Sequence, residues 1–296
     1  MGVLRHFLAA CLVLVALGSA MAQDRPRVVA VNYPLQFLAE RLLGDAAEVV
    51  FPVPEDVDPS FWRPTIADIS MIQSADLILL NGAGFATWID RVSLPRSKLV
   101  NTSAAVDDMF IVTESITHSH GDGGAHSHEG LASYLWLDPM LAIAQAEAVA
   151  AAITARDLAP AAEVEAAMDA LRSDLEALDD QTRAALGDLQ GVSMIATHPR
   201  YHYFARRYGL SVTALEWEAG AMPGDSDMAD LRDLAEETGA QVLIWEAAPP
   251  AEAFEMTRGL GLRNVVFAPL AHGVAGQTYI DTLAGAVAAM EEALPR

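Results

Sequence analysis

The chain has 296 residues, enough for two modest domains or one large one, and a formal net charge of −22 with Lys98 as its only lysine. Nucleic acid and anionic membranes are excluded as partners, because neutralising their phosphates requires clustered Lys and Arg. Cys11 is the only cysteine, so no disulfide forms within the chain, and we expect nitrogen and oxygen ligands for any metal.

The first 22 residues are predicted to be a cleaved signal peptide. Arg5 supplies the positive charge, residues 7–17 form an apolar run shorter than the ~20 residues of a membrane span, and an Ala-x-Ala cleavage site ends at Ala22. An uncleaved membrane anchor is the alternative. Cys11 lies inside the apolar run, whereas a lipidated cysteine would follow it. We therefore expect a periplasmic protein without a lipid anchor.

Short apolar runs of strand length alternate with helical patterns through residues 23–159, which we assign to an N-terminal lobe. This alternation is typical of parallel α/β layers. The predicted strands are residues 27–32, 49–53, 75–81 and 98–101, and the predicted helices are residues 34–43, 65–74 and 139–155.

A Gly- and His-rich segment, residues 117–130, interrupts the pattern and is predicted to be a surface loop. His118, His120, His126 and His128 form two His-Ser-His pairs, and alternate imidazoles on a flexible chain can converge on one zinc ion. Such a loop binds weakly and exchanges metal quickly, because ordering it costs conformational entropy. The alternative is a polar insertion without a metal.

Residues 160–189 are predicted to form one long helix with apolar positions at alternating four- and three-residue steps. Residues 190–296 repeat the α/β alternation as a C-terminal lobe. Two α/β lobes joined by a rigid helix place a ligand cleft between them, at the carboxyl ends of the strands. The predicted strands of the second lobe are residues 192–196, 211–214, 242–245 and 265–267, and its predicted helices are residues 200–208, 227–238, 251–260 and 279–294.

Three residues at predicted strand ends are candidate metal ligands. His198 follows one strand and precedes a helix, so its imidazole is expected to project into the cleft. Glu246 and Glu218 each follow another strand and can supply a charge-neutralising oxygen. The alternatives are a hydrogen bond from His198 to the backbone, and solvation or a helix N-terminal position for the glutamates.

Short motifs lie in a fixed order along the chain: Asp58-Pro59, Asn81-Gly82, residues 136–139, His198 and residues 203–210. In this order and spacing the chain resembles the zinc/manganese branch of periplasmic solute-binding proteins. The resemblance implies two lobes around a metal cleft, a monomer, and an ABC permease as partner. It implies capture of a divalent metal and no catalysis.

The chain departs from the ligand pattern that the resemblance implies. Family members have histidines where this chain has Ser60 and Tyr134, and a carboxylate where it has Ala268, so only His198 of four usual ligands is retained. We therefore expect the other ligands to come from Glu246 or Glu218, from the loop histidines, from water, or from a chelating molecule. The nitrogen-rich candidates favour zinc over manganese.

Ser60, Trp62, Tyr134 and Trp217 are predicted to line the cleft. An aromatic wall there would suit a metal chelate or an organic ligand, which is one alternative function. A second alternative is a metal-stabilised adhesin on the same fold. A zinc enzyme would need an open coordination position near His198. The sequence has no Gly-rich phosphate loop after a strand, no nucleophile elbow and no His-Glu-x-x-His helix, so we predict no enzymatic activity.

Overall fold

The structure is a computed structural model that describes residues 25–113, 130–187 and 191–293. The predicted signal peptide and the loop histidines His118, His120, His126 and His128 lie outside the described residues. No helix in the described part of the chain combines the length and the apolar character needed to cross a bilayer.

The N-terminal lobe is built on a four-stranded parallel sheet with the strand order β2-β1-β3-β4. The two central strands are almost entirely buried, as expected for a parallel sheet that is covered on both faces. Asn32 accepts a hydrogen bond from the amide of Leu35 and so caps the first helix. The elements are β1 (Arg27–Ala30), α2 (Tyr33–Leu43), β2 (Glu48–Val50), α3 (Ile66–Ser74), β3 (Leu77–Leu80), β4 (Leu99–Asn101) and α4 (Pro139–Ala155).

The C-terminal lobe repeats this plan with the strand order β10-β9-β7-β8, again all parallel. Strand β9 is buried at every position and lies at the centre of the sheet. The elements are β7 (Ser193–Ala196), α6 (His202–Tyr208), β8 (Ser211–Ala214), α7 (Asp225–Thr238), β9 (Val242–Trp245), α8 (Ala251–Arg258), β10 (Arg263–Val266) and α9 (Tyr279–Ala293).

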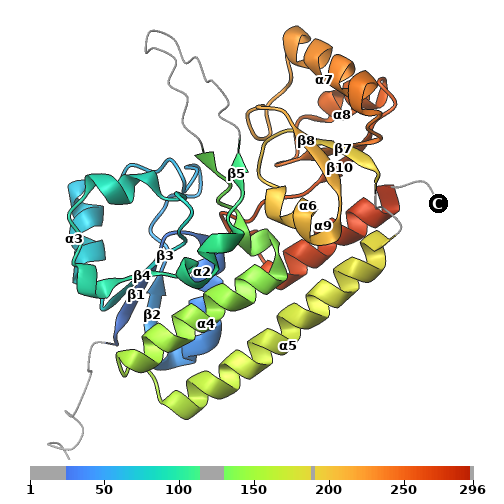
Figure 1. The fold of residues 1–296 in the computed structure, drawn as a ribbon. Coiled ribbons are helices and arrows are strands. Elements are labelled where there is room, and N and C mark those ends of the chain that lie inside the picture. The colour runs from blue at the N-terminus through green and yellow to red at the C-terminus, as the bar shows by residue number, and fades with distance from the viewer. Residues whose placement is uncertain (1–24, 114–129, 188–190, 294–296) are drawn as a thin grey trace, which may run out of the picture.

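One helix, α5 (Ala161–Leu186), runs along both lobes, with α4 beside its first part and α9 beside its last part (Figure 1). The largest cluster of buried side chains is continuous from Val29 in β1 through Leu171 in α5 to Ile244 in β9. Trp136 adds a direct link, because its indole N–H donates to the carbonyl of Pro269 in the other lobe at 2.8 Å. The predicted fold of two α/β lobes joined by a long helix is confirmed.

Short elements connect the main ones. Strands β5 (Val112–Thr113) and β6 (Gly130–Leu131) pair antiparallel on either side of residues 114–129, which lie outside the described residues (Figure 1). The short 3-10 helices are η1 (Gly44–Ala46), η2 (Thr87–Arg91), η3 (Arg96–Lys98), η4 (Ala104–Met109) and η5 (Leu135–Leu137).

Candidate functional site

His198 and Glu246 meet where the two adjacent strands β7 and β9 end. The amide of Glu246 donates to the hydroxyl oxygen of Thr197, which holds the two strand ends together. His198 Nδ1 lies 3.8 Å from Glu246 Oε2, and both side chains are mostly buried. The same nitrogen lies 3.0 Å from the carbonyl oxygen of Trp217. When Nδ1 donates to that carbonyl, Nε2 carries the lone pair that a metal ion needs.

Arg200, two residues after His198, connects this corner to the N-terminal lobe. Its Nη2 lies 2.8 Å from Asp58 Oδ2, and its Nε lies 3.5 Å from Glu246 Oε1. The guanidinium carbon is 4.7 Å from the centre of the Tyr134 ring. Burial disfavours the charged form, but Tyr134, Glu246 and Asp58 together raise the pKa of Arg200 above its ordinary value. Arg200 is therefore a permanent cation between the lobes.

Tyr134 contacts this cation and Ser60 contacts its partner Asp58, and both Tyr134 and Ser60 are buried. Ser60 donates to Asp58 Oδ1 from its hydroxyl at 2.5 Å and from its amide at 2.8 Å, and so orients the carboxylate. The Tyr134 ring packs against Phe85 and Trp136. Burial raises the pKa of Tyr134 well above its ordinary value, so the phenol stays neutral and is a poor metal ligand.

The contacts described for Trp62, Trp217 and Glu218 each stay within one lobe. Trp62 packs edge-on against Trp88 in the N-terminal lobe, with ring centres 5.5 Å apart. The Trp217 ring packs against Trp245 inside the C-terminal lobe, so only its backbone carbonyl contacts His198. Glu218 is exposed, in a turn closed by a hydrogen bond from the amide of Ala221 to the Glu218 carbonyl.

Within residues 25–113, 130–187 and 191–293, no three His, Cys, Asp or Glu side chains are arranged as a ready set of metal ligands. His198 and Glu246 offer one nitrogen and one oxygen ligand side by side, and Arg200 holds the nearby carboxylate of Asp58. Sequence reasoning did not single out Arg200 or Asp58 as site residues. The available signal was an arginine two positions after His198 in a chain with few basic residues.

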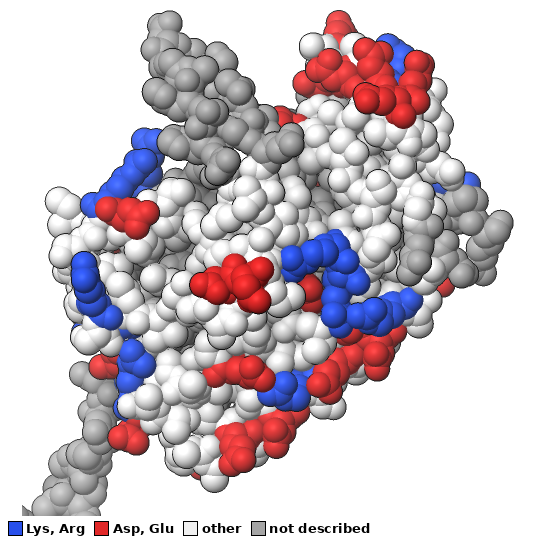
Figure 2. Space-filling view, viewed as in Figure 1, with Lys and Arg blue, Asp and Glu red and all other residues white. Residues whose placement is uncertain are grey.

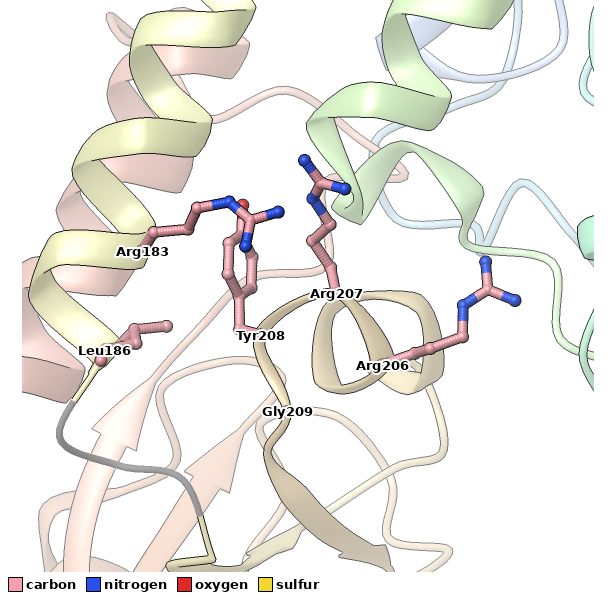
Figure 3. A pocket seen from close by; sticks show the side chains of 7 residues that line it. Arg183, Leu186, Arg206, Arg207, Tyr208 and Gly209 are labelled. Atoms are coloured by element: carbon pink, nitrogen blue, oxygen red, sulfur yellow. The ribbon is translucent and has the colours of Figure 1, made fainter.

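A second group of arginines lies outside the interlobe corner, around a cavity of about 310 Å³ between the end of α5 and α6 (Figure 3). Arg183 and Arg207 both bind the buried carboxylate of Asp179, and Arg206 donates to the carbonyl of Met109. On the face shown in Figure 2 a group of basic side chains lies near the middle, and acidic side chains crowd over α7. Arg207 and Asp179 tie α6 to α5, and Arg206 ties α6 to η4 of the N-terminal lobe.

Comparison with known proteins identifies a family whose members match this chain through both lobes. Residues 28–293 match the family described as "Zinc-uptake complex component A periplasmic", ZnuA. The high-affinity zinc uptake system protein ZnuA of Bacillus subtilis (strain 168) is 27% identical over 252 residues, which cover 81% of this chain and 79% of the relative. The zinc-binding lipoprotein AdcA of Streptococcus pneumoniae serotype 4 is 26% identical over 290 residues, which cover 94% of this chain.

The chain spans only 56% of the length of that streptococcal relative. Among solved structures, the metal-dependent lipoprotein YcdH of Bacillus subtilis has the same fold, with a TM-score of 0.76 at 22% identity, covering 90% of this chain and 98% of the other. Because the family match runs through both lobes and the connecting helix, the chain belongs to the family of zinc-uptake complex component A, ZnuA.

Proposed function

We propose that the chain is a periplasmic solute-binding protein that captures a divalent transition metal ion, zinc first, and delivers it to an ABC importer. Both curated relatives above are named for zinc, and the family description is that of an uptake component. The observation that carries the proposal is the placement of His198 and Glu246 side by side at the carboxyl ends of two parallel strands, with Nδ1 3.8 Å from Oε2. This edge of an α/β sheet is where ligands bind.

The chemistry of this corner suits zinc better than manganese. Zinc accepts imidazole nitrogen and carboxylate oxygen in a four-coordinate site, whereas carboxylate, carbonyl and water oxygens are the ligands that suit manganese. His198 and Glu246 supply two of the four positions. The remaining positions are open to water, to the exposed Glu218, to a chelating molecule bound with the metal, or to His118, His120, His126 and His128 of the histidine-rich segment.

The proposal includes export, a free mature chain and a monomer. Mature protein recovered from the periplasm should begin at Gln23 and carry no lipid, because Cys11 would be removed with the leader. Mass spectrometry of the recovered protein tests this directly. An acylated Cys11 would instead place the chain with relatives that are named as lipoproteins.

The test of the metal site is calorimetric titration of zinc into chelator-stripped mature protein. His198→Ala should weaken the tightest binding at least about tenfold, or about 1.4 kcal/mol, because it removes the nitrogen ligand from the corner. His202→Gln is the matched control, since it removes a nearby half-buried histidine that has no hydrogen-bond partner for Nδ1 in the described structure. Unchanged affinity in His198→Ala would reject the interlobe site.

A further inference from the structure

The interlobe corner already holds a cation, and that cation is part of the chain. Arg200 extends from the C-terminal lobe toward Asp58 of the N-terminal lobe, and its side chain is only 11% exposed. The two carboxylate oxygens of Glu246 face different partners: Oε1 faces Arg200 and Oε2 faces His198. The guanidinium therefore lies between a carboxylate from each lobe, next to an imidazole.

We propose that Asp58, His198 and Glu246 form a latent site for a divalent cation, and that Arg200 is a built-in competitor which the metal ion displaces. The inference rests on the proposed function, since it names the ligands and the competitor of that same site. With Arg200 in place, Asp58 and Glu246 each have one oxygen facing the guanidinium. Among the described residues, Asp58, His198 and Glu246 are therefore not arranged as a preformed set of metal ligands.

Charge favours the exchange. Two carboxylates around one guanidinium leave the corner with a formal charge of −1, whereas two carboxylates around one divalent ion are neutral. Poorly hydrated carboxylates are costly unless they are fully neutralised. Zinc also takes as a ligand the lone pair that His198 Nε2 carries when Nδ1 donates to the Trp217 carbonyl.

The contacts of Arg200 are uneven, which makes it displaceable. Its Nη2 has a short ion pair with Asp58, but its Nε is buried without a hydrogen-bond partner among the described residues and lies 3.5 Å from Glu246. The face of Tyr134 supplies a cation–π contact rather than a directional bond. Ser60 keeps Asp58 Oδ1 occupied, so the carboxylate stays oriented toward the corner when the guanidinium leaves.

The decisive variant is Arg200→Gln in the mature protein, titrated with zinc by calorimetry. Removing the competitor should tighten zinc binding about tenfold or more, and adding Asp58→Asn to the same chain should abolish the gain. Arg232→Gln is the matched control, because it removes an exposed arginine of α7 and should leave the affinity unchanged. Circular dichroism and thermal unfolding establish that each variant is folded.

The outcomes separate the inference from the function on which it rests. Equal or weaker zinc binding by Arg200→Gln, with binding by the parent still dependent on His198, would overturn Arg200 as a competitor and leave the proposed function standing. Zinc binding that is independent of His198 in every variant would overturn both. If Arg200→Gln does not fold, Arg200→Met is the second variant, since it removes the charge and keeps an unbranched side chain that can pack against the Tyr134 ring. Tighter zinc binding by the methionine variant would support the inference, and equal or weaker binding would overturn it.

Discussion

Two arginine–carboxylate clusters lie in this molecule, and they differ in which partner is fully bonded. In the cluster on α5, the buried Asp179 carboxylate accepts from Arg207 at 2.6 and 2.9 Å, from Arg183 at 3.1 Å and from the Tyr208 hydroxyl at 3.0 Å. In the interlobe cluster Arg200 and Glu246 are both mostly buried, and only the ion pair of Arg200 with Asp58 is short.

The pKa values reflect the same difference. Burial opposes ionisation of Asp179, but hydrogen bonds from Arg207, Arg183 and Tyr208 outweigh it and lower the pKa of this carboxyl. Because each of its partners donates, the cluster joins α6 to α5 in one arrangement. The Arg200 corner leaves a buried Nε without a hydrogen bond, so a better cation can replace the guanidinium. The first cluster is suited to holding the fold together, and the second to exchange.

The largest expected effect is at Asp179. Asp179→Asn should destabilise the protein by about 3 kcal/mol, because it removes the charge that neutralises two arginines and replaces one of the two acceptor oxygens with an NH2 donor. Since the pKa of Asp179 is lowered in the folded protein, its contribution is present above the unfolded value of ~3.9 and is lost as pH falls through the folded value. Urea unfolding at pH 7 and at acid pH measures both effects.

Asp174→Asn on the same helix is the control for that variant. Asp174 makes an ion pair with Arg41 at 2.7 Å, but half of its side chain is exposed, so the loss should stay below about 1 kcal/mol. Equal losses in the two variants would mean that the Asp179 cluster is no more than another surface pair, and the contrast with the interlobe corner would disappear.

A smaller effect is expected when the interlobe cluster is cut. Asp58→Asn should lower the free energy of unfolding by about 1 kcal/mol without metal. The loss is small because Arg200 still has its ion pair with Glu246 and its cation–π contact with the Tyr134 ring. Ser60→Ala should cost less, since it removes only the hydroxyl bond to Asp58. Thermal unfolding of the chelator-stripped proteins gives the comparison. A loss as large as that of Asp179→Asn would show that the Arg200 corner is also a fixed part of the fold.

Much of the fold could be predicted from local patterns, because each pattern records which face of an element is buried. The apolar steps within residues 160–189 match α5 (Ala161–Leu186), whose positions such as Leu171 and Leu175 are fully buried. The predicted strand at residues 49–53 ends earlier, at Val50, because Pro52 has no N–H to donate to a neighbouring strand. The two-residue strands β5 and β6 carry no pattern long enough to detect.

Only the site residues that come from a single lobe could be predicted from the sequence. His198 and Glu246 follow predicted parallel strands, and strand order brings them together. The contact between Arg200 and Asp58 spans 142 residues of sequence and depends on how the lobes sit, which no local spacing records. Position in the sequence can also mislead. Trp217 follows a strand, and we therefore predicted that it lines the cleft, but its ring packs against Trp245 inside the C-terminal lobe.

His202 is a half-buried histidine near the interlobe corner, and we expect it to affect the pH dependence of stability but not metal binding. Desolvation lowers the pKa of His202, so the unfolded chain binds the proton more readily than the folded one. Stability should therefore fall as pH drops below the unfolded value of ~6.5, and His202→Gln should remove this part of the fall. Parallel unfolding curves of the two proteins from pH 7.5 to 5 would contradict this.

The smallest expected effect on stability is that of the histidine-rich segment. Deleting residues 117–129 leaves β5, β6 and both arginine clusters intact, so thermal unfolding without metal should be unchanged within about 0.5 kcal/mol. The deletion should reduce the number of weakly bound zinc ions, because it removes His118, His120, His126 and His128, while the tightest site stays dependent on His198. A deletion of equal length cannot be matched elsewhere, so the control replaces these four histidines with serine in the full-length chain. A loss of the tightest zinc site in both variants would assign its ligands to the loop. The interlobe corner would then be a structural contact between the lobes, like the Asp179 cluster, and not a metal site.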